Sequence, residues 1–159
     1  MRMLQFLARH CRSYRLLVHP PAYTASQRAR WLHLPGRQVL KGVLVQGIHG
    51  PLLAVLPATQ IIELESLGFF CGEVLHLADP LAVAQRFRDC EFGVVPAFGS
   101  LYGLPTYLDA DLDPACEVAL PGPTHFHSVV MMLEDYERLE RPVRAAFACE
   151  REAFTLRSA

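Results

Sequence analysis

The feature that most constrains the fold is a pair of apolar segments separated by a glycine-containing turn. Residues 39–45 and 52–56 are rich in β-branched residues and leucine, and residues 46–50 between them include Gly47 and Gly50. Two such segments joined by a short glycine-containing turn are typical of a β-hairpin. We therefore expect them to form the central strands of the fold.

The composition predicts one globular domain. The chain has 159 residues, of which 52% are hydrophobic and 19% are charged. A chain of this size can bury a core without a disulfide or a metal. Strand and helix patterns are interspersed without regular βαβ spacing, so we expect a single α/β domain in which a mixed, barrel-like β-sheet is surrounded by helices. The domain is expected to span residues 1–142, and residues 143–159 to form a C-terminal tail or short helix.

Capping signals predict helices around the hairpin. Thr24 is followed three residues later by Gln27, which is the pattern of a capping box and predicts a helix that begins there. Further helices are expected from Thr59 to Gly68, over residues 80–89 and from Glu134 onward. Short strands are expected over residues 14–18, 94–95, 106–108, 117–120 and 128–132.

The distribution of polar residues argues against a membrane protein. The most apolar stretch, residues 39–62, is interrupted by Lys41, Pro51 and Pro57, so no run approaches the roughly 20 residues that span a bilayer. The first apolar run stops at Arg9, too soon for a secretory signal. We therefore expect a cytoplasmic protein with no membrane partner. Because the formal net charge is -1, any contact with RNA should be local or aided by a partner.

The spacing of metal-ligating residues does not predict a metal site. The five cysteines lie far apart and form no CxxC pair, so we expect reduced and mostly buried thiols. If residues 125–127 formed a strand, His125 and His127 would share one face, but two histidines cannot complete a tetrahedral zinc site. The acidic residues from Asp109 to Asp113 lack the glycine and glutamate of an EF-hand. We expect no metal and no cofactor.

Lys41 is the first candidate for a functional residue. In the predicted strand it shares a face with Val43 and Val45, while Gly42 faces the other side. One interpretation is that its ammonium extends into water near the strand end. The other is that it points into a cleft and holds a phosphate or a ribose hydroxyl. Gly42 would let a ligand approach the backbone closely. The strand pattern alone leaves both interpretations open.

The segment from Glu91 to Gly99 is the second candidate. Gly93, Pro96 and Gly99 are typical of a tight, fixed loop. Such a loop can be purely structural, or its amides can hold a carbonyl oxygen or a water in place.

Several landmarks follow one another between residues 15 and 140. They are Thr24-Ala25, Lys41, residues 53–58, residues 93–99, residues 104–109 and Gly122. In order and spacing they resemble the YbaK/prolyl-tRNA synthetase-associated editing family, whose members remove small amino acids from tRNA. The resemblance implies a YbaK-like aminoacyl-tRNA deacylase domain over residues 1–142 that acts in trans. It also implies local contacts with the acceptor end of aminoacyl-tRNA, and an aminoacyl-tRNA synthetase as a further partner.

The resemblance also implies roles for single residues. Lys41 matches the lysine that engages the terminal adenosine, and Gly93 belongs to the loop that shapes the aminoacyl pocket, so these two are the expected catalytic residues. A histidine after Gly122 lies near the substrate in some relatives, which suggests His125 as a pocket contact. The expected substrate-binding residues are Thr24, Gly42, Phe92, Val94, Val95, Pro96, Phe98, Gly99 and His125. The bulk of Phe92, Val94, Val95 and Phe98 implies a pocket for a small side chain.

The absence of a nucleophile motif shapes the expected mechanism. The sequence contains no GxSxG elbow, no Ser-His-Asp order and no GxxxxGK[ST] phosphate loop. Hydrolysis would therefore use a water positioned by the Gly93 loop and a ribose hydroxyl. An alternative is a non-catalytic module that retains an aminoacyl-adenosine pocket, suggested by Phe92 where the family usually has glycine. A thiol enzyme is disfavoured because no cysteine lies in a basic or glycine-rich setting.

Overall fold

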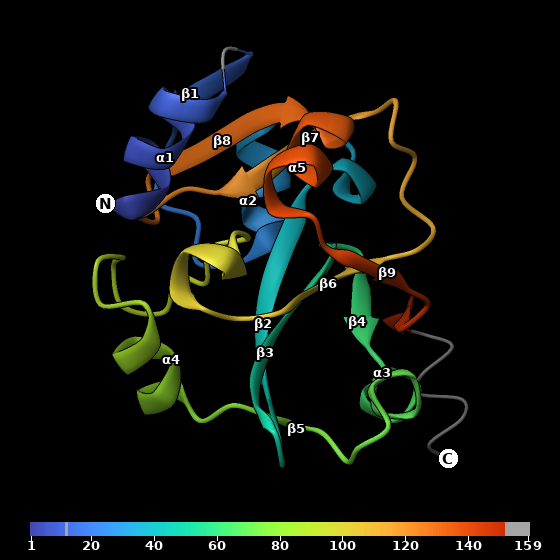
Figure 1. Cartoon of the computed structure of the whole chain (residues 1–159). Coiled ribbons are helices and arrows are strands. Elements are labelled where there is room, and N and C mark those ends of the chain that lie inside the picture. Colours follow the sequence, from blue (N-terminus) through green and yellow to red (C-terminus); the bar gives the residue numbers. More distant parts are fainter. Residues whose placement is uncertain (12, 152–159) are drawn as a thin grey trace.

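The computed structural model describes residues 1–11 and 13–151 (Figure 1). The helices are α1 (Arg2–His10), α2 (Ala25–Leu32), α3 (Leu64–Cys71), α4 (Pro80–Arg86) and α5 (Leu133–Glu140), and two short 3₁₀ helices cover Gly36–Gln38 and Gly99–Tyr102. The strands are β1 (Tyr14–Val18), β2 (Leu40–Gly47), β3 (Gly50–Pro57), β4 (Gln60–Ile62), β5 (His76–Leu77), β6 (Thr106–Asp109), β7 (Glu117–Pro121), β8 (His127–Met132), β9 (Val143–Ala145) and β10 (Ala148–Glu150).

The predicted hairpin is confirmed as the centre of the largest sheet. Strands β2 and β3 pair antiparallel from Leu40 opposite Pro57 to Gly47 opposite Gly50, so only two residues form the turn. The sheet has the order β5-β2-β3-β6-β9. It is mixed, because β6 is parallel to both β3 and β9 whereas β5 is antiparallel to β2.

Two smaller sheets complete the fold, with the orders β1-β8-β7 and β10-β4. A parallel bridge between Val39 and Ala119 connects the start of β2 to β7. The predicted mixed α/β domain is thus confirmed. Within residues 1–11 and 13–151 its sheets do not close into a barrel.

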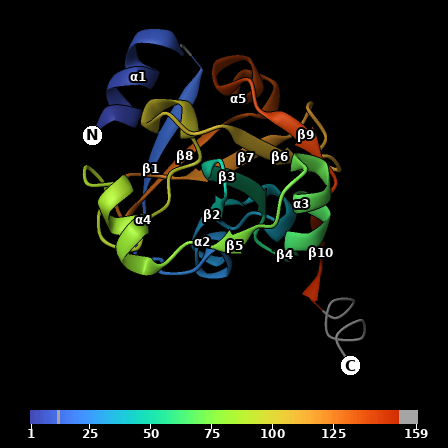
Figure 2. The same cartoon turned by 60° about the horizontal axis from the view of Figure 1, so that its bottom comes forward.

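The two faces of the hairpin bury different clusters of apolar side chains. Leu40 and Leu44 belong to a cluster that includes residues of α1 and α5, whereas Val45 belongs to a cluster that includes a residue of α3. Figures 1 and 2 show α4 and α3 on opposite sides of the hairpin. The alternation is the one predicted, and it places Gly42 on the face of Leu44 and Lys41 on the face of Val45.

Three local predictions are wrong. Residues 60–62, expected to be helical, form strand β4 because they pair with β10, and α3 begins only after Glu63. The helix predicted over residues 80–89 ends at Arg86. Residues 94–95 form no strand, since they follow Gly93, which has a φ of 84° and belongs to a turn.

The segment after Pro142 also differs from the prediction. Residues 143–159 were expected to form a tail or a short helix, but Val143–Ala145 and Ala148–Glu150 are strands β9 and β10. Both pair with strands that lie far away in the sequence, β6 and β4, so no local pattern indicates them. Residues 152–159 lie outside the described residues.

The loop from Glu91 to Gly99 packs closely against β2. Tyr136 of α5 donates its hydroxyl to the carbonyl of Ala97 at 2.6 Å. On the other side, a Cβ added to Gly42 would lie 2.8 Å from Cγ1 of Val95 and 3.2 Å from the carbonyl oxygen of Pro96. Position 42 therefore requires glycine, because a side chain there would push the loop away from the strand.

The end of this loop is held by a buried carboxylate. Glu140, the last residue of α5, accepts hydrogen bonds from the amide of Ser100 at 2.9 Å, from the hydroxyl of Ser100 at 2.6 Å and from the hydroxyl of Thr106. Burial raises the pKa of this carboxyl group. A single side chain of α5 thus joins the 3₁₀ helix after the loop to strand β6.

We expect Gly42→Ala to lower the free energy of unfolding by about 1–3 kcal/mol, because the added methyl group meets backbone carbonyls that cannot rotate away. Urea denaturation would measure this loss. Gly47→Ala in the same strand is the control, since the three atoms nearest its added Cβ belong to the carboxylate of Glu73, the end of a flexible side chain. Equal losses in the two variants would contradict the explanation.

Candidate functional site

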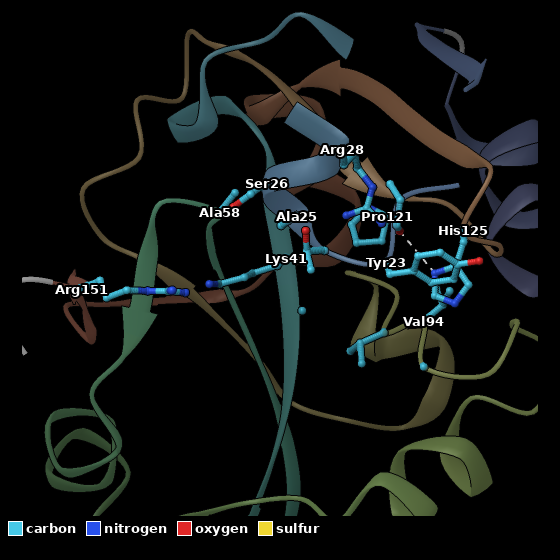
Figure 3. A pocket seen from close by; sticks show the side chains of 15 residues that line it. Tyr23, Ala25, Ser26, Arg28, Lys41, Ala58, Val94, Pro121, His125 and Arg151 are labelled. Carbon is cyan, nitrogen blue, oxygen red and sulfur yellow. Dashed lines mark hydrogen bonds between the residues drawn. The ribbon is translucent and has the colours of Figure 1, made fainter. Parts of the chain in front are cut away.

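A cavity of about 290 Å³ lies where α2, the start of β2 and the Gly93 loop meet (Figure 3). It brings together seven of the residues predicted from the sequence, namely Thr24, Lys41, Gly42, Gly93, Val94, Val95 and His125. These residues come from segments up to about a hundred positions apart in the chain. Only the tertiary fold places them around one space.

The other four predicted residues, Phe92, Pro96, Phe98 and Gly99, do not line this cavity. The side chain of Phe92 is 68% exposed and borders a neighbouring hollow, so it does not fill the cavity. Phe98 is fully buried and packs against Tyr136. Gly99 starts the 3₁₀ helix next to Thr106. Phe98 and Gly99 thus pack against the interior of the protein, whereas Phe92 faces outward.

Lys41 reaches the cavity from β2. Its Nζ donates to the carbonyl of Gln60 at 2.5 Å, and Figure 3 shows it extending toward Arg151. Burial, followed by the charge of Arg151, lowers the pKa of Lys41. It is the only lysine in the chain, in which every other basic side chain apart from histidine is arginine. A compact amine with spare protons therefore faces the cavity at this position.

His125 fixes the Gly93 loop from the opposite side. Its Nε2 lies 2.9 Å from the carbonyl oxygen of Phe92, and its Nδ1 lies 3.3 Å from the carbonyl oxygen of Ala22. A neutral imidazole has one N–H and can donate to only one of these carbonyls, and the shorter distance favours Phe92. The backbone amide of His125 also donates to the carboxylate of Glu91 at 2.7 Å. The amide of Ala22 donates to the carbonyl of His125 at 2.9 Å, so His125 connects the loop to the segment before α2.

The start of α2 forms the third wall, and here the predicted capping box is confirmed. The amide of Gln27 donates to Oγ1 of Thr24 at 3.1 Å, and the side-chain oxygen of Gln27 accepts from the amide of Thr24 at 3.2 Å. The ring of Tyr23 packs against the ring of His125 at a tilt of 49°, with a centroid distance of 4.7 Å. The cap orients the first turn of α2 toward the cavity.

The sequence analysis missed Arg28. This residue of α2 lines the cavity and is only 6% exposed. Burial lowers its pKa to about 10. The signal that could have found it is the helical spacing, because residue 28 follows the cap Thr24 by four positions and so lies on the same side of the helix.

His125 and His127 would share one face only if residues 125–127 formed a strand, and they do not. Strand β8 begins at His127, while His125 lies in the preceding loop. Nδ1 of His127 lies 2.6 Å from the hydroxyl of Thr124, so the two rings have different partners. Among residues 1–11 and 13–151, no group of three or more His, Cys, Asp or Glu side chains could hold a metal ion. The same part of the chain has no helix that is both long and apolar enough to cross a bilayer.

The family that these landmarks suggested can be tested by comparison with known proteins. The family model described as "Aminoacyl-tRNA editing domain" matches residues 19–139. The chain belongs to this family. The matched range contains all the described cavity residues except Arg151. No curated protein matches the chain.

Solved structures share the fold of this editing domain. A candidate trans-editing enzyme for prolyl tRNA synthetase has a TM-score of 0.80 at 23% identity, over 92% of this chain and 94% of its own. The hypothetical protein APE2540 has a TM-score of 0.85 at 17% identity, over 94% and 100%. A scaffold protein used for computational epitope grafting has a TM-score of 0.81 at 25% identity, over 92% and 94%.

We expect the amine of Lys41 to titrate below the usual lysine value of about 10.4, because burial disfavours its charged form. Since this is the only lysine, protein labelled with ¹³C-lysine gives a single Cε signal whose shift can be followed against pH by NMR. Arg151→Gln should raise the midpoint part of the way toward the usual value, because it removes the positive charge that also lowers the pKa of Lys41. Arg141→Gln, which changes an exposed arginine, should not. A midpoint at or above the usual value would contradict the prediction.

Proposed function

We propose that this editing domain is an aminoacyl-tRNA deacylase that acts in trans and hydrolyses the ester of a small, mischarged amino acid. The observation that carries the proposal is the cavity itself. Lys41, Gly93 and His125, which the family resemblance singled out at three distant positions, line the same cavity. The match of residues 19–139 to the editing family supports the same function.

The site supports hydrolysis by a positioned water. Lys41 offers a charge-assisted donor that suits a ribose hydroxyl or phosphate of the terminal nucleotide. The described residues that line the cavity include no carboxylate, and both ring nitrogens of His125 lie near backbone carbonyls. No described side chain is therefore placed as a strong general base. An aminoacyl ester is already activated, so holding it near a water and a ribose hydroxyl supplies much of the required acceleration.

The size of the cavity favours a small aminoacyl group. Its volume is about 290 Å³, and Val94 and Val95 line it from the loop side. Part of this space must also take the ribose, which leaves little room for a large side chain. Apolar walls separate neighbouring sizes by only about 1–3 kcal/mol, so discrimination among small residues should be loose.

The partners follow from the same proposal. Aminoacyl-tRNA would be contacted locally, at its acceptor end, because the chain as a whole carries a formal net charge of only -1. A synthetase is proposed as a further partner, supported by the similar fold of a candidate trans-editing enzyme for prolyl tRNA synthetase. The alternative of a non-catalytic binding module rested on Phe92, whose exposed side chain leaves the cavity open.

A deacylation screen tests the function directly. We expect tRNAs charged with alanine, cysteine or serine to lose their amino acid faster than tRNA charged with phenylalanine, because the cavity is small. Threonine and proline complete the series. Release of the labelled amino acid above the rate without protein is the measurement. Fastest hydrolysis of the aromatic ester would show that the pocket is assigned wrongly, and no hydrolysis of any substrate would favour the binding module.

Lys41→Ala should lower the single-turnover rate on the best substrate at least tenfold. A hydrogen bond from a charged donor contributes roughly 1.5–3 kcal/mol, and about 1.4 kcal/mol corresponds to a factor of ten in rate. The thermal midpoint should stay level or rise slightly, since a partly buried charge is removed. Arg30→Ala, which removes an exposed charge, is the control and should keep the wild-type rate. A Lys41→Ala protein with wild-type rate and stability would contradict the mechanism.

A further inference from the structure

Arg28 is a buried cation that has no counter-charge among residues 1–11 and 13–151. Its side chain is 94% buried, and its Nε makes no hydrogen bond to any described residue. Burial alone accounts for the lowering of its pKa, so no neighbouring carboxylate contributes. By contrast, the guanidinium of Arg144, which is also partly buried, is paired with the carboxylate of Glu137 at 2.6 Å.

No negatively charged side chain among the described residues lines the cavity around Arg28. The described lining of the cavity contains Arg28, Lys41 and Arg151, and no aspartate or glutamate. Figure 3 shows Lys41 and Arg151 extending toward each other on one side of the cavity, while Arg28 reaches in from α2. The lining thus has two cationic centres, carried by different elements of the fold.

We propose that Arg28 binds an oxyanion of the ligand, a phosphate or a carboxylate, inside this cavity. Burying a guanidinium without a partner is unfavourable, and an entering anion would remove that cost when it binds. The planar guanidinium can present two parallel N–H donors to the two oxygens of such a group. The cavity then selects for a ligand that carries negative charge near its reacting end.

Two parts of an aminoacyl-tRNA could supply this oxyanion, and this choice rests on the proposed function. One is the phosphate of the terminal nucleotide. The other is a side-chain carboxylate on the amino acid, as in an aspartyl ester. Both would meet the same donors, so binding experiments with matched probes must separate them.

The first experiment needs no hydrolysis and no tRNA. Arg28→Met removes the charge but keeps a side chain of similar length, and Arg30→Met makes the same change at an exposed position of the same helix. Without ligand, Arg28→Met should melt at or above the wild-type temperature, because an uncompensated buried charge is gone. Inorganic phosphate should raise the melting temperature of wild type and Arg30→Met more than that of Arg28→Met. Equal phosphate effects in all three proteins would overturn the proposal, as would a marked drop in the melting temperature of Arg28→Met alone.

The second experiment identifies the source of the oxyanion. Dissociation constants are measured by calorimetry for adenosine, adenosine 5′-monophosphate, and the non-hydrolysable 3′-alanylamino and 3′-aspartylamino derivatives of 3′-deoxyadenosine. We expect Arg28→Met to lose at least tenfold in affinity for one charged probe, with little change for its neutral counterpart. Loss for the monophosphate identifies the nucleotide phosphate, and loss for the aspartyl derivative identifies the side-chain carboxylate. Arg28→Lys keeps the positive charge but loses the two parallel N–H donors of the guanidinium, so it should retain part of the affinity.

The outcomes separate this inference from the proposed function. Phosphate binding that depends on Arg28 in a protein that deacylates nothing would keep the inference and refute the deacylase. Conversely, the protein could deacylate tRNA while wild type, Arg28→Met and Arg30→Met bind every probe with the same affinity. That result would support the proposed function and refute the inference.

Discussion

The close packing of the Gly93 loop on strand β2 is the constraint on which the site depends. At Gly42 the carbonyl oxygens of Val95 and Pro96 would lie 3.1 and 3.2 Å from an added Cβ, so the strand must lack a side chain there. This contact brings the loop against the strand that carries Lys41. Because Lys41 and Gly42 alternate across the strand, one residue presents its amine while the next accepts the loop.

Hydrogen bonds then hold the loop in that position from elements far away in the sequence. Tyr136 binds the carbonyl of Ala97, and the amide of His125 binds the carboxylate of Glu91. The imidazole of His125 lies within hydrogen-bonding distance of the carbonyl of Phe92. Buried polar groups of this kind are costly when unpaired, so each pair favours one arrangement of the loop over its alternatives. A positioned loop is what a mechanism without a strong general base requires.

The parts of the fold that were predicted correctly are those with a local signal. The hairpin follows from two apolar segments and a turn. The start of α2 follows from Thr24 and Gln27, which lie three positions apart and each accept a hydrogen bond from the backbone amide of the other. Strands β4, β9 and β10 carry no comparable signal, because each is only three residues long and forms by pairing with a distant partner. In such segments tertiary pairing overrides local propensity.

The same distinction applies to the site. The family resemblance pointed to Lys41, Gly93 and His125, and all three line the cavity. It gave no reason to choose Arg28, since whether an arginine is solvated or buried depends on what packs over its helix. It also grouped Phe92 and Phe98 with the pocket, although one is exposed and the other is buried in the core. Adjacency in a loop sequence does not tell which side chains face the cavity and which face the protein.

The charge distribution reconciles a nearly neutral chain with an anionic substrate. A formal net charge of -1 gives no long-range attraction to a nucleic acid, and exposed charges are screened within about 8 Å at physiological ionic strength. Inside a partly enclosed cavity the screening is weaker, so cations act strongly on an entering ligand when the described lining residues around them include no carboxylate. Recognition would therefore come late, at the end of the substrate that reaches the cavity, and not from capture of the whole tRNA. Under the proposed function, such a domain would gain from a partner that delivers the acceptor end, which is the physical argument for proposing a synthetase in that role.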